Sequence, residues 1–280
     1  MFGSLLVGNR LLNEKMNQYD PQTRRNFKLV LEYDGSGYHG WQRQAGALSI
    51  QEVVESRLGV MLGGKVSVRA SGRTDSGVHA HGQVINFYSR TRMKPEEILK
   101  GLNSLLPNDI VVLEAEEMDD SFHARFSAVS KLYEYRILNR MVPSALLRNY
   151  AWHVRQPLQT APMEECLRMI RGLNDFSAFM ASGSPVNSTE RNMFRAFMEQ
   201  PRPDHLKFTY EANGFLRHMV RNLTGTIVEV GKGKRTPEDF ARILASKDRR
   251  KAGATAPANG LYLISVCYAT HEMITTEGLK

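Results

Sequence analysis

The chain contains 280 residues, of which 42% are hydrophobic and 24% are charged. This is the composition of a soluble globular protein with one large domain or two modest ones, and no apolar run approaches the length of a membrane span. Lysine and arginine exceed aspartate and glutamate by 37 to 29, so the net charge is +8. That excess favours a polyanionic partner, although many basic proteins bind no nucleic acid.

The cysteine pattern argues against a disulfide framework and against a cysteine-based metal centre. Cys166 and Cys267 lie far apart in apolar surroundings, and neither has metal-ligand spacing around it. The apolar patch at residues 5–7 is too short for the core of a signal peptide. We therefore expect a cytoplasmic protein with no membrane segment and no metal.

Residues 1–25 lack a sustained period and end in a polar run, which predicts a flexible extension, with Met16 as an alternative start. After this extension, the first half reads as strand, helix, strand, strand, helix, strand. A capping box of Ser49 and Glu52 precedes the first helix, and Pro95 opens the second. The order is that of a ferredoxin-like module, with elements at residues 27–33, 50–62, 66–70, 83–88, 94–106 and 110–115.

The second half repeats this order and adds one helix. Its predicted elements are a strand at 131–139, a helix that Thr160 caps, strands at 191–198 and 206–212, helices at 215–230 and 236–244, and a strand at 261–268. We therefore predict an α+β protein of two ferredoxin-like β-α-β-β-α-β modules, residues 26–125 and 126–270, followed by a tail at 271–280. Their mainly antiparallel sheets are expected to meet edge to edge, because such modules leave free edges to cover.

The most distinctive stretch is residues 69–87, which read RASGRTDSGVHAHGQVINF. A polar loop lies here between two β-rich runs, and Gly72 and Gly77 bracket Arg73, Thr74 and Asp75. Glycines permit the backbone dihedrals that present a short side chain or admit a ligand closely. The spacing alone is also that of an ordinary Asx turn, in which the aspartate needs no function.

Two further segments carry side chains suited to binding or chemistry. The predicted helix at 215–230 places Arg217 and Arg221 four residues apart on one face, which fits either a solvated basic face or an anion contact. Tyr133 and Tyr135 share one face of their strand, where they fit either a core position or a stacking role.

Two motifs favour structural explanations. Gly35, Gly37 and Gly40 spell GxGxxG, but no helix follows directly, which argues against a dinucleotide-binding turn. His79 and His81 alternate along a strand, and no cysteine or carboxylate pattern completes a metal site around them, so we expect a structural role for both.

Other residues leave two interpretations open. His39 and Trp41 either contact RNA or pack within their loop. A basic group near the C-terminus either binds phosphates or is simply solvated; its members are Lys232, Lys234, Arg235, Lys247, Arg249, Arg250 and Lys251.

Four strings in this chain resemble the motifs of the TruA-type tRNA pseudouridine synthases, and they occur in the family's order. They are YDGSGYHGWQ, SGRTDSGVHA, KLYEYRI and NGFLRHMVRN, and the resemblance runs from about residue 29 to residue 268. It implies two α/β domains that flank a central cleft, the pseudouridine synthase fold. It also implies a homodimer that isomerises uridine to pseudouridine at positions 38, 39 and 40 of tRNA, with no cofactor.

The resemblance assigns roles to individual residues. Asp75 matches the family's catalytic nucleophile, with Arg73 beside it to fill or brace the space that a flipped base vacates. Arg221 of MVRN is expected to approach and orient Asp75, and Tyr133 to pack against the target uracil with its phenol available for proton transfer. The family tolerates other residues at Arg217, which we leave as a phosphate contact.

The chemistry requires an ionised carboxylate, which nearby arginines stabilise, and a base extruded from its helix. Asp75 would attack the ribose or the base, or promote elimination, and the residues leave these routes open. A non-catalytic RNA-recognition motif has the same element order, but the corresponding strand GQVINFYS lacks the RNP1 pattern of alternating aromatics. A family member with other target uridines or another RNA is the remaining alternative.

Overall fold

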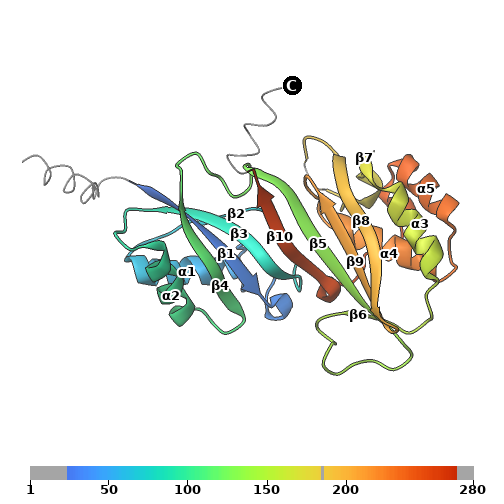
Figure 1. Cartoon of the computed structure of the whole chain (residues 1–280), viewed down its shortest axis with the longest axis horizontal. Helices are drawn as coiled ribbons and strands as arrows, with labels where there is room; N and C mark the ends of the chain where they lie inside the picture. The colour runs from blue at the N-terminus through green and yellow to red at the C-terminus, as the bar shows by residue number, and fades with distance from the viewer. Residues whose placement is uncertain (1–23, 184–185, 270–280) are drawn as a thin grey trace, which may run out of the picture.

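The computed structural model describes residues 24–183 and 186–269, which form a mixed α+β fold (Figure 1). The predicted extension at residues 1–25, apart from Arg24 and Arg25, and the tail beyond Ala269 lie outside the described residues, as does Met16. None of the helices described is long and apolar enough to cross a membrane.

The first half of the chain contains four strands, two helices and a short 3-10 helix within the described residues. They are β1 (Arg25–Tyr33), η1 (Gly35–Gly37), α1 (Ile50–Leu62), β2 (Arg69–Ala70), β3 (His79–Ser89), α2 (Pro95–Leu105) and β4 (Ile110–Met118). Alternation explains β1, whose Phe27, Leu29 and Leu31 are fully buried. The Ser49 side chain caps α1, and a left-handed Gly63 ends it.

The second half supplies the remaining elements. They are β5 (Ala128–Asn139), β6 (Trp152–Val154), α3 (Thr160–Met169), β7 (Gly172–Asp175), η2 (Ser177–Phe179), β8 (Glu190–Arg202), β9 (His205–Ala212), α4 (Met219–Gly231), α5 (Pro237–Ser246), η3 (Arg249–Lys251), η4 (Ala258–Gly260) and β10 (Leu261–Tyr268). Thr236 and Asp239 form the capping box that opens α5.

All strands described belong to one mainly antiparallel sheet in the order β4-β1-β3-β10-β5-β9-β8-β7, with β2 beside β3 and β6 beside β5. The two halves meet where β3 and β10 run parallel, at the pairs Tyr262 with His79 and Leu263 with Ala80. The predicted edge-to-edge junction is therefore confirmed. Helices α1 and α2 lie toward one end of the sheet and α3, α4 and α5 toward the other (Figure 1).

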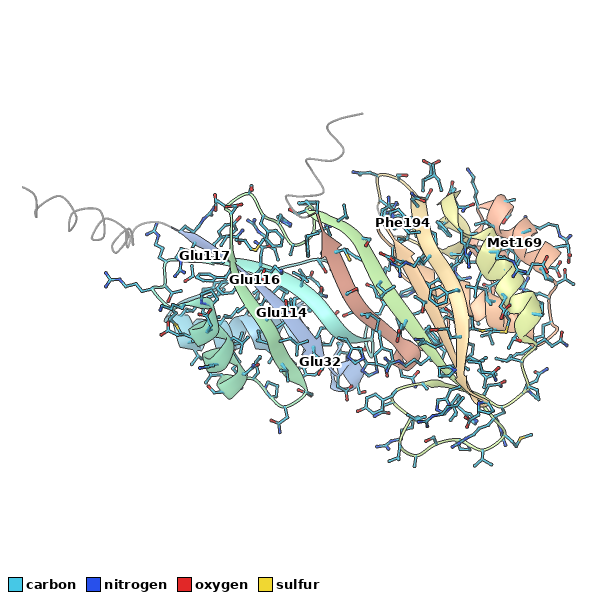
Figure 2. The ribbon with its side chains drawn as sticks, viewed as in Figure 1. Glu32, Glu114, Glu116, Glu117, Met169 and Phe194 are labelled. Atoms are coloured by element: carbon cyan, nitrogen blue, oxygen red, sulfur yellow. The ribbon has the colours of Figure 1, made fainter. Side chains whose placement is uncertain are left out.

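Acidic side chains mark the outer strand β4 of this sheet. Glu114, Glu116 and Glu117 are exposed there, and Glu32 lies on the neighbouring strand β1 (Figure 2). Charge on an edge strand opposes pairing with another chain, because a second edge would have to desolvate it. The acidic row thus protects the open edge of the sheet.

Several predicted elements differ from the structure, among them β3 and β8, which extend beyond the expected bounds to His79 and Arg202. The strand expected at 66–70 is reduced to two residues, because only Arg69 and Ala70 pair with β3. The helix expected from residue 215 begins at Met219, because His218 adopts a left-handed conformation with φ of 62° that interrupts it. Gln159, rather than Thr160, occupies the N-cap position of α3, without a side-chain cap.

The junction of the two halves encloses His79. Its Nδ1 accepts a hydrogen bond of 3.2 Å from the Gly35 N–H, its Nε2 lies 2.9 Å from the Asn149 carbonyl oxygen, and its ring stacks on Tyr262. Burial lowers the pKa of His79, against the opposing influence of the Asn149 carbonyl and the Asp34 carboxylate. The structural role predicted for His79 is consistent with these contacts.

We expect the free energy of unfolding to fall as pH drops from about 7 to about 5, because the unfolded chain, with His79 near its ordinary pKa of about 6.5, binds a proton that the folded state resists. Replacement His79→Gln should lower stability at neutral pH and make this pH dependence shallower. Urea unfolding at several pH values measures both effects. The exposed His39→Gln serves as control and should keep the wild-type pH dependence; a wild-type slope in His79→Gln would contradict the prediction.

Candidate active site

The loop at residues 71–78, which joins β2 to β3, is fixed in place by the first segment of the chain. The Trp41 N–H donates to the Thr74 carbonyl oxygen over 3.0 Å, and the hydroxyls of Tyr33 and Thr74 lie 2.8 Å apart. The Ser76 hydroxyl donates to the Tyr38 carbonyl oxygen over 3.1 Å. The position of this loop therefore depends on the motif YDGSGYHGWQ.

Gly40 allows this close contact between the two motifs. Its φ is +84°, and a Cβ at this position would lie 2.6 Å from the Thr74 carbonyl oxygen. The neighbouring Trp41 is 2% exposed, so packing within the loop accounts for it, whereas His39 is exposed. Gly35 and Gly40 of the apparent GxGxxG string thus serve loop packing, since a Cβ at Gly35 would clash with the Val78 carbonyl oxygen.

The carboxylate of Asp75 meets the guanidinium of Arg221. The Arg221 Nη1 donates to Asp75 Oδ2 over 2.8 Å, although the two residues are 146 positions apart in the sequence. The Asp75 side chain is 25% exposed and that of Arg221 is 16% exposed. The pair is therefore partly shielded from solvent while the carboxylate stays accessible.

A backbone carbonyl holds Arg221 in this orientation. Its Nε donates to the Ala256 carbonyl oxygen over 2.8 Å, and the Ala256 N–H donates back to the Arg221 carbonyl oxygen over 3.0 Å. The sequence reasoning did not identify Ala256, because a carbonyl group is common to every residue and leaves no pattern in the sequence. Arg221 is thus oriented before any ligand binds.

His218 is a second neighbour of Asp75 that the sequence reasoning did not identify. Its Nε2 lies 3.5 Å from Asp75 Oδ2, and its left-handed backbone precedes α4 directly. Burial lowers the pKa of His218, and the charge of Asp75 opposes that effect. The imidazole is therefore neutral at neutral pH. Its place within the motif NGFLRHMVRN is the only sequence signal that pointed to it.

Tyr133 lies on β5 and is 8% exposed. Its ring meets the edge of Phe215, with ring centroids 5.0 Å apart and planes at 77°. Burial, followed by the charges of Tyr33 and Asp75, raises the pKa of Tyr133 above its ordinary range. The phenol is therefore protonated at neutral pH.

The other two arginines of the motifs do not join this group. Arg73 and Arg217 are exposed, and neither side chain makes an ion pair or hydrogen bond with any part of the chain that the structure describes. Arg217 precedes α4 instead of sharing a helical face with Arg221. Of the arginines predicted at the site, only Arg221 contacts Asp75.

Most of the basic group near the C-terminus has acidic or carbonyl partners. Arg235 pairs with Glu229, Lys247 with Asp175, and Arg250 with Asp248. Arg249 donates to the carbonyl oxygens of Ala252 and Gly253 and to the Asn222 and Thr255 side chains. Its hydrogen bonds give Arg249 a structural role, whereas Lys247 and Arg250 are 63% and 90% exposed.

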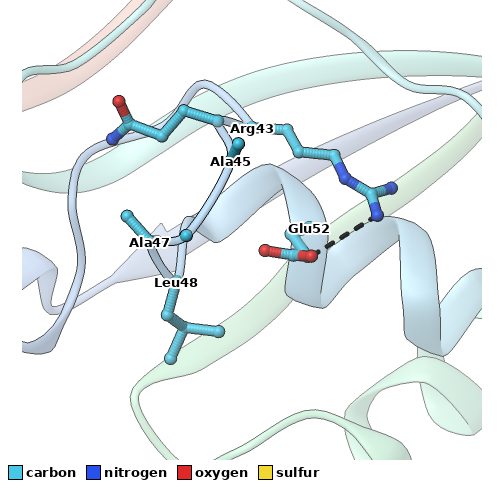
Figure 3. Close-up of a pocket in the computed structure, with 7 residues that line it drawn as sticks. Arg43, Ala45, Ala47, Leu48 and Glu52 are labelled. Atoms are coloured by element: carbon cyan, nitrogen blue, oxygen red, sulfur yellow. Dashed lines mark ion pairs between the residues drawn. The ribbon is translucent and has the colours of Figure 1, made fainter.

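No group of three or more histidine, cysteine or acidic side chains that could hold a metal occurs among residues 24–183 and 186–269. The exposed loop before α1 forms a shallow hollow of about 620 Å³, crossed by an ion pair of 3.4 Å between Arg43 and Glu52 (Figure 3). Its lining includes none of Asp75, Tyr133 and Arg221. These three residues lie away from the hollow, where the two halves of the chain meet.

The arrangement around Asp75 suits nucleophilic catalysis by a carboxylate. A partly exposed carboxylate is fixed by a guanidinium, and a neutral imidazole lies beside it. Such groups keep a carboxylate oriented, and the Asp75 side chain stays 25% exposed.

Comparisons with known proteins identify the family of this chain. The family model described as tRNA pseudouridine synthase matches residues 29–127 and 167–269. Proteins named tRNA pseudouridine synthase A are similar over 87% or 86% of this chain: one from Thermoanaerobacter sp. strain X514 is 46% identical and covered over its full length, and one from Moorella thermoacetica is 46% identical and covered over 98%. Another, from Acetivibrio thermocellus, is 43% identical and fully covered. The chain therefore belongs to the tRNA pseudouridine synthase family.

Proposed function

We propose that this enzyme isomerises uridine to pseudouridine at positions 38, 39 and 40 of the anticodon stem and loop of tRNA, with Asp75 as the nucleophile. The observation that carries the proposal is the 2.8 Å contact between Arg221 and Asp75, because it brings the motifs GRTD and MVRN to one carboxylate. Family membership supports the reaction, and the names of the relatives support tRNA as the substrate.

The reaction explains why an accessible carboxylate is needed. A paired base hides its glycosidic bond, so the target uridine must leave the helix before it can react. Isomerisation then breaks the C1′–N1 bond and forms a C1′–C5 bond, while C5 loses a proton and N1 gains one. Asp75 acts as the covalent catalyst, either by attack on the ribose or base or by promoting elimination.

The other site residues hold the extruded nucleotide and the space it leaves. Tyr133 packs against the uracil, and its phenol is available to transfer a proton. Arg221 and His218 orient Asp75. Arg73 is exposed, so its side chain is available to enter the helix in place of the uridine.

The domain organisation follows the repeated order of the strands. β4-β1-β3-β2 in the first half and β10-β5-β9-β8 in the second share the order of a ferredoxin-like sheet. We therefore propose that residues 26–125 and 126–270 are two ferredoxin-like modules that flank a central cleft. We also propose a cytoplasmic homodimer, as the family resemblance implies.

Replacement Asp75→Asn should lower turnover by at least about 10³-fold, because the amide cannot serve as a nucleophile. The measurement is tritium release from tRNA labelled at C5 of uracil, with the modified nucleotides mapped in the same reaction. Affinity for tRNA should change little. Asp120→Asn removes an exposed carboxylate that pairs with Arg24 and serves as control. Wild-type turnover by Asp75→Asn would refute the assignment.

Tyr133→Phe and Tyr133→Leu separate the two proposed roles of this residue. The phenylalanine variant keeps the stacking surface, so tRNA affinity should be retained while turnover falls by about 10²-fold through loss of the phenol. The leucine variant should lose both affinity and turnover. Tritium release and filter binding measure the two quantities. Unchanged turnover in Tyr133→Phe would show that the phenol transfers no proton and would leave stacking as the only role of Tyr133.

Gly40→Ala should displace the Asp75 loop, because the added Cβ meets the Thr74 carbonyl oxygen and the backbone φ is positive. We expect a loss of about 1 to 3 kcal/mol in unfolding free energy and at least a 10-fold loss of turnover. The matched control is Gly37→Ala, whose Cβ meets nothing within 4 Å. Equal stability and turnover in the two variants would show that this contact does not position the loop.

A further inference from the structure

Three cationic side chains gather beside the Asp75 loop, and the chemistry described so far uses none of them. The Lys131 Nζ donates to the Ser71 carbonyl oxygen over 2.5 Å, at the start of that loop. Arg125 and Arg191 line one hollow of about 340 Å³. We call Arg125, Lys131 and Arg191 the cationic triad.

The triad lies close to the proposed position of the uracil. Lys131 and Tyr133 are on the same face of β5, two residues and about 7 Å apart along the strand. Arg191 Nε lies 3.5 Å from the position that a Cβ on Gly214 would occupy, just before the segment that carries His218. The triad is thus placed between the Asp75 loop and the approach to α4.

No member of the triad has an acidic partner within the part of the chain that the structure describes. Arg191 donates to the carbonyl oxygens of Ser188 and Glu190, and the Arg125 guanidinium faces the ring of Phe126. A carboxylate on the adjacent strand β9, that of Glu211, is engaged by the Ser130 hydroxyl and by Arg195. The positive charges of the triad are therefore left uncompensated.

The pKa of Lys131 reflects this uncompensated positive charge. Burial, followed by the positive charges of Arg125 and Arg191, lowers its pKa to about 8. A bound anion would stabilise the charged ammonium and both guanidinium groups at once, because each like-charge repulsion would be replaced by attraction. The cluster thus has the character of an anion-binding site.

We propose that Arg125, Lys131 and Arg191 bind a backbone phosphate of the tRNA within one or two nucleotides of the extruded uridine. This inference rests on the proposed function and extends it from the reacting base to the strand that carries the base. Phosphate contacts position a nucleic acid without reading its sequence. Here they would hold the strand in the extruded conformation, at the stage when the base has lost its stacking partners.

The experiment compares Arg125→Gln/Arg191→Gln with Arg202→Gln, each placed in the Asp75→Asn background so that binding is measured without turnover. Arg202 is an exposed arginine at the far end of β8, roughly 35 Å along the strand from Arg191. Binding of an unmodified tRNA transcript is followed over a range of salt concentrations. The double variant should bind at least about 10-fold more weakly, with a salt dependence reduced by about one to two counterions.

A second measurement locates the phosphate. Single neutral methylphosphonates are placed at the phosphates on either side of the target uridine, up to two nucleotides away. For the protein with an intact triad, the methylphosphonate at one of these positions should weaken tRNA binding by about the factor that the double substitution causes. The double variant should bind this modified tRNA as well as it binds the unmodified one. A tRNA affinity equal to that of Arg202→Gln, or no such coupling at any position, would overturn the proposal.

The outcomes distinguish this inference from the function on which it rests. Lack of pseudouridine formation by the wild-type enzyme would refute the proposed function itself. Competition by inorganic phosphate at the triad, together with methylphosphonates that have no effect, would assign the site to a free anion and reject the tRNA backbone. Both proposals would be supported if the wild-type enzyme forms pseudouridine and if the double substitution and one flanking methylphosphonate weaken tRNA binding non-additively.

Discussion

The contact between Arg221 and Asp75 depends on the whole fold, because it joins residues from the two halves of the chain. Asp75 sits on a loop of the first half of the chain and Arg221 in the first turn of α4, and the single sheet brings them within 2.8 Å. Because Ala256 already orients the guanidinium, the carboxylate meets a fixed charge that need not reorganise during the reaction. Loss of the β3–β10 junction would separate the two charges.

The start of α4 determines how Asp75 is surrounded. His218 takes a left-handed conformation, so the helix begins at Met219 and both His218 and Arg221 face the same carboxylate oxygen. A carboxylate at this position also lies near the positive end of the helix dipole. If the helix started at Phe215, His218 and Arg221 would not both face this oxygen. The strained backbone at His218 is therefore needed for the contacts around Asp75.

Periodic packing was predictable from the sequence, whereas contacts through backbone atoms were not. The strands and helices follow apolar patterns, as in β1, where Phe27, Leu29 and Leu31 point to the core. The pairing of Arg221 with Asp75 was inferred from resemblance, because spacing alone allowed a solvated basic face. Neither the positive φ of His218 nor the Ala256 carbonyl has a side-chain signature, since both depend on tertiary contacts.

The Asp75 carboxylate is fixed, but the surface around it is open. An open surface offers few contacts to an extruded base, so other parts of the protein must supply binding energy. The Asp75 side chain is 25% exposed, so in the proposed reaction the protein alone would not enclose the base. An extruded uridine gives up its stacking and pairing, at a cost of a few kcal/mol, and the stacking proposed for Tyr133 would restore only part of that free energy. The cationic triad, in which Lys131 shares a face of β5 with Tyr133, would supply the remainder through the phosphate backbone, where no base sequence is read and different uridines can be accepted.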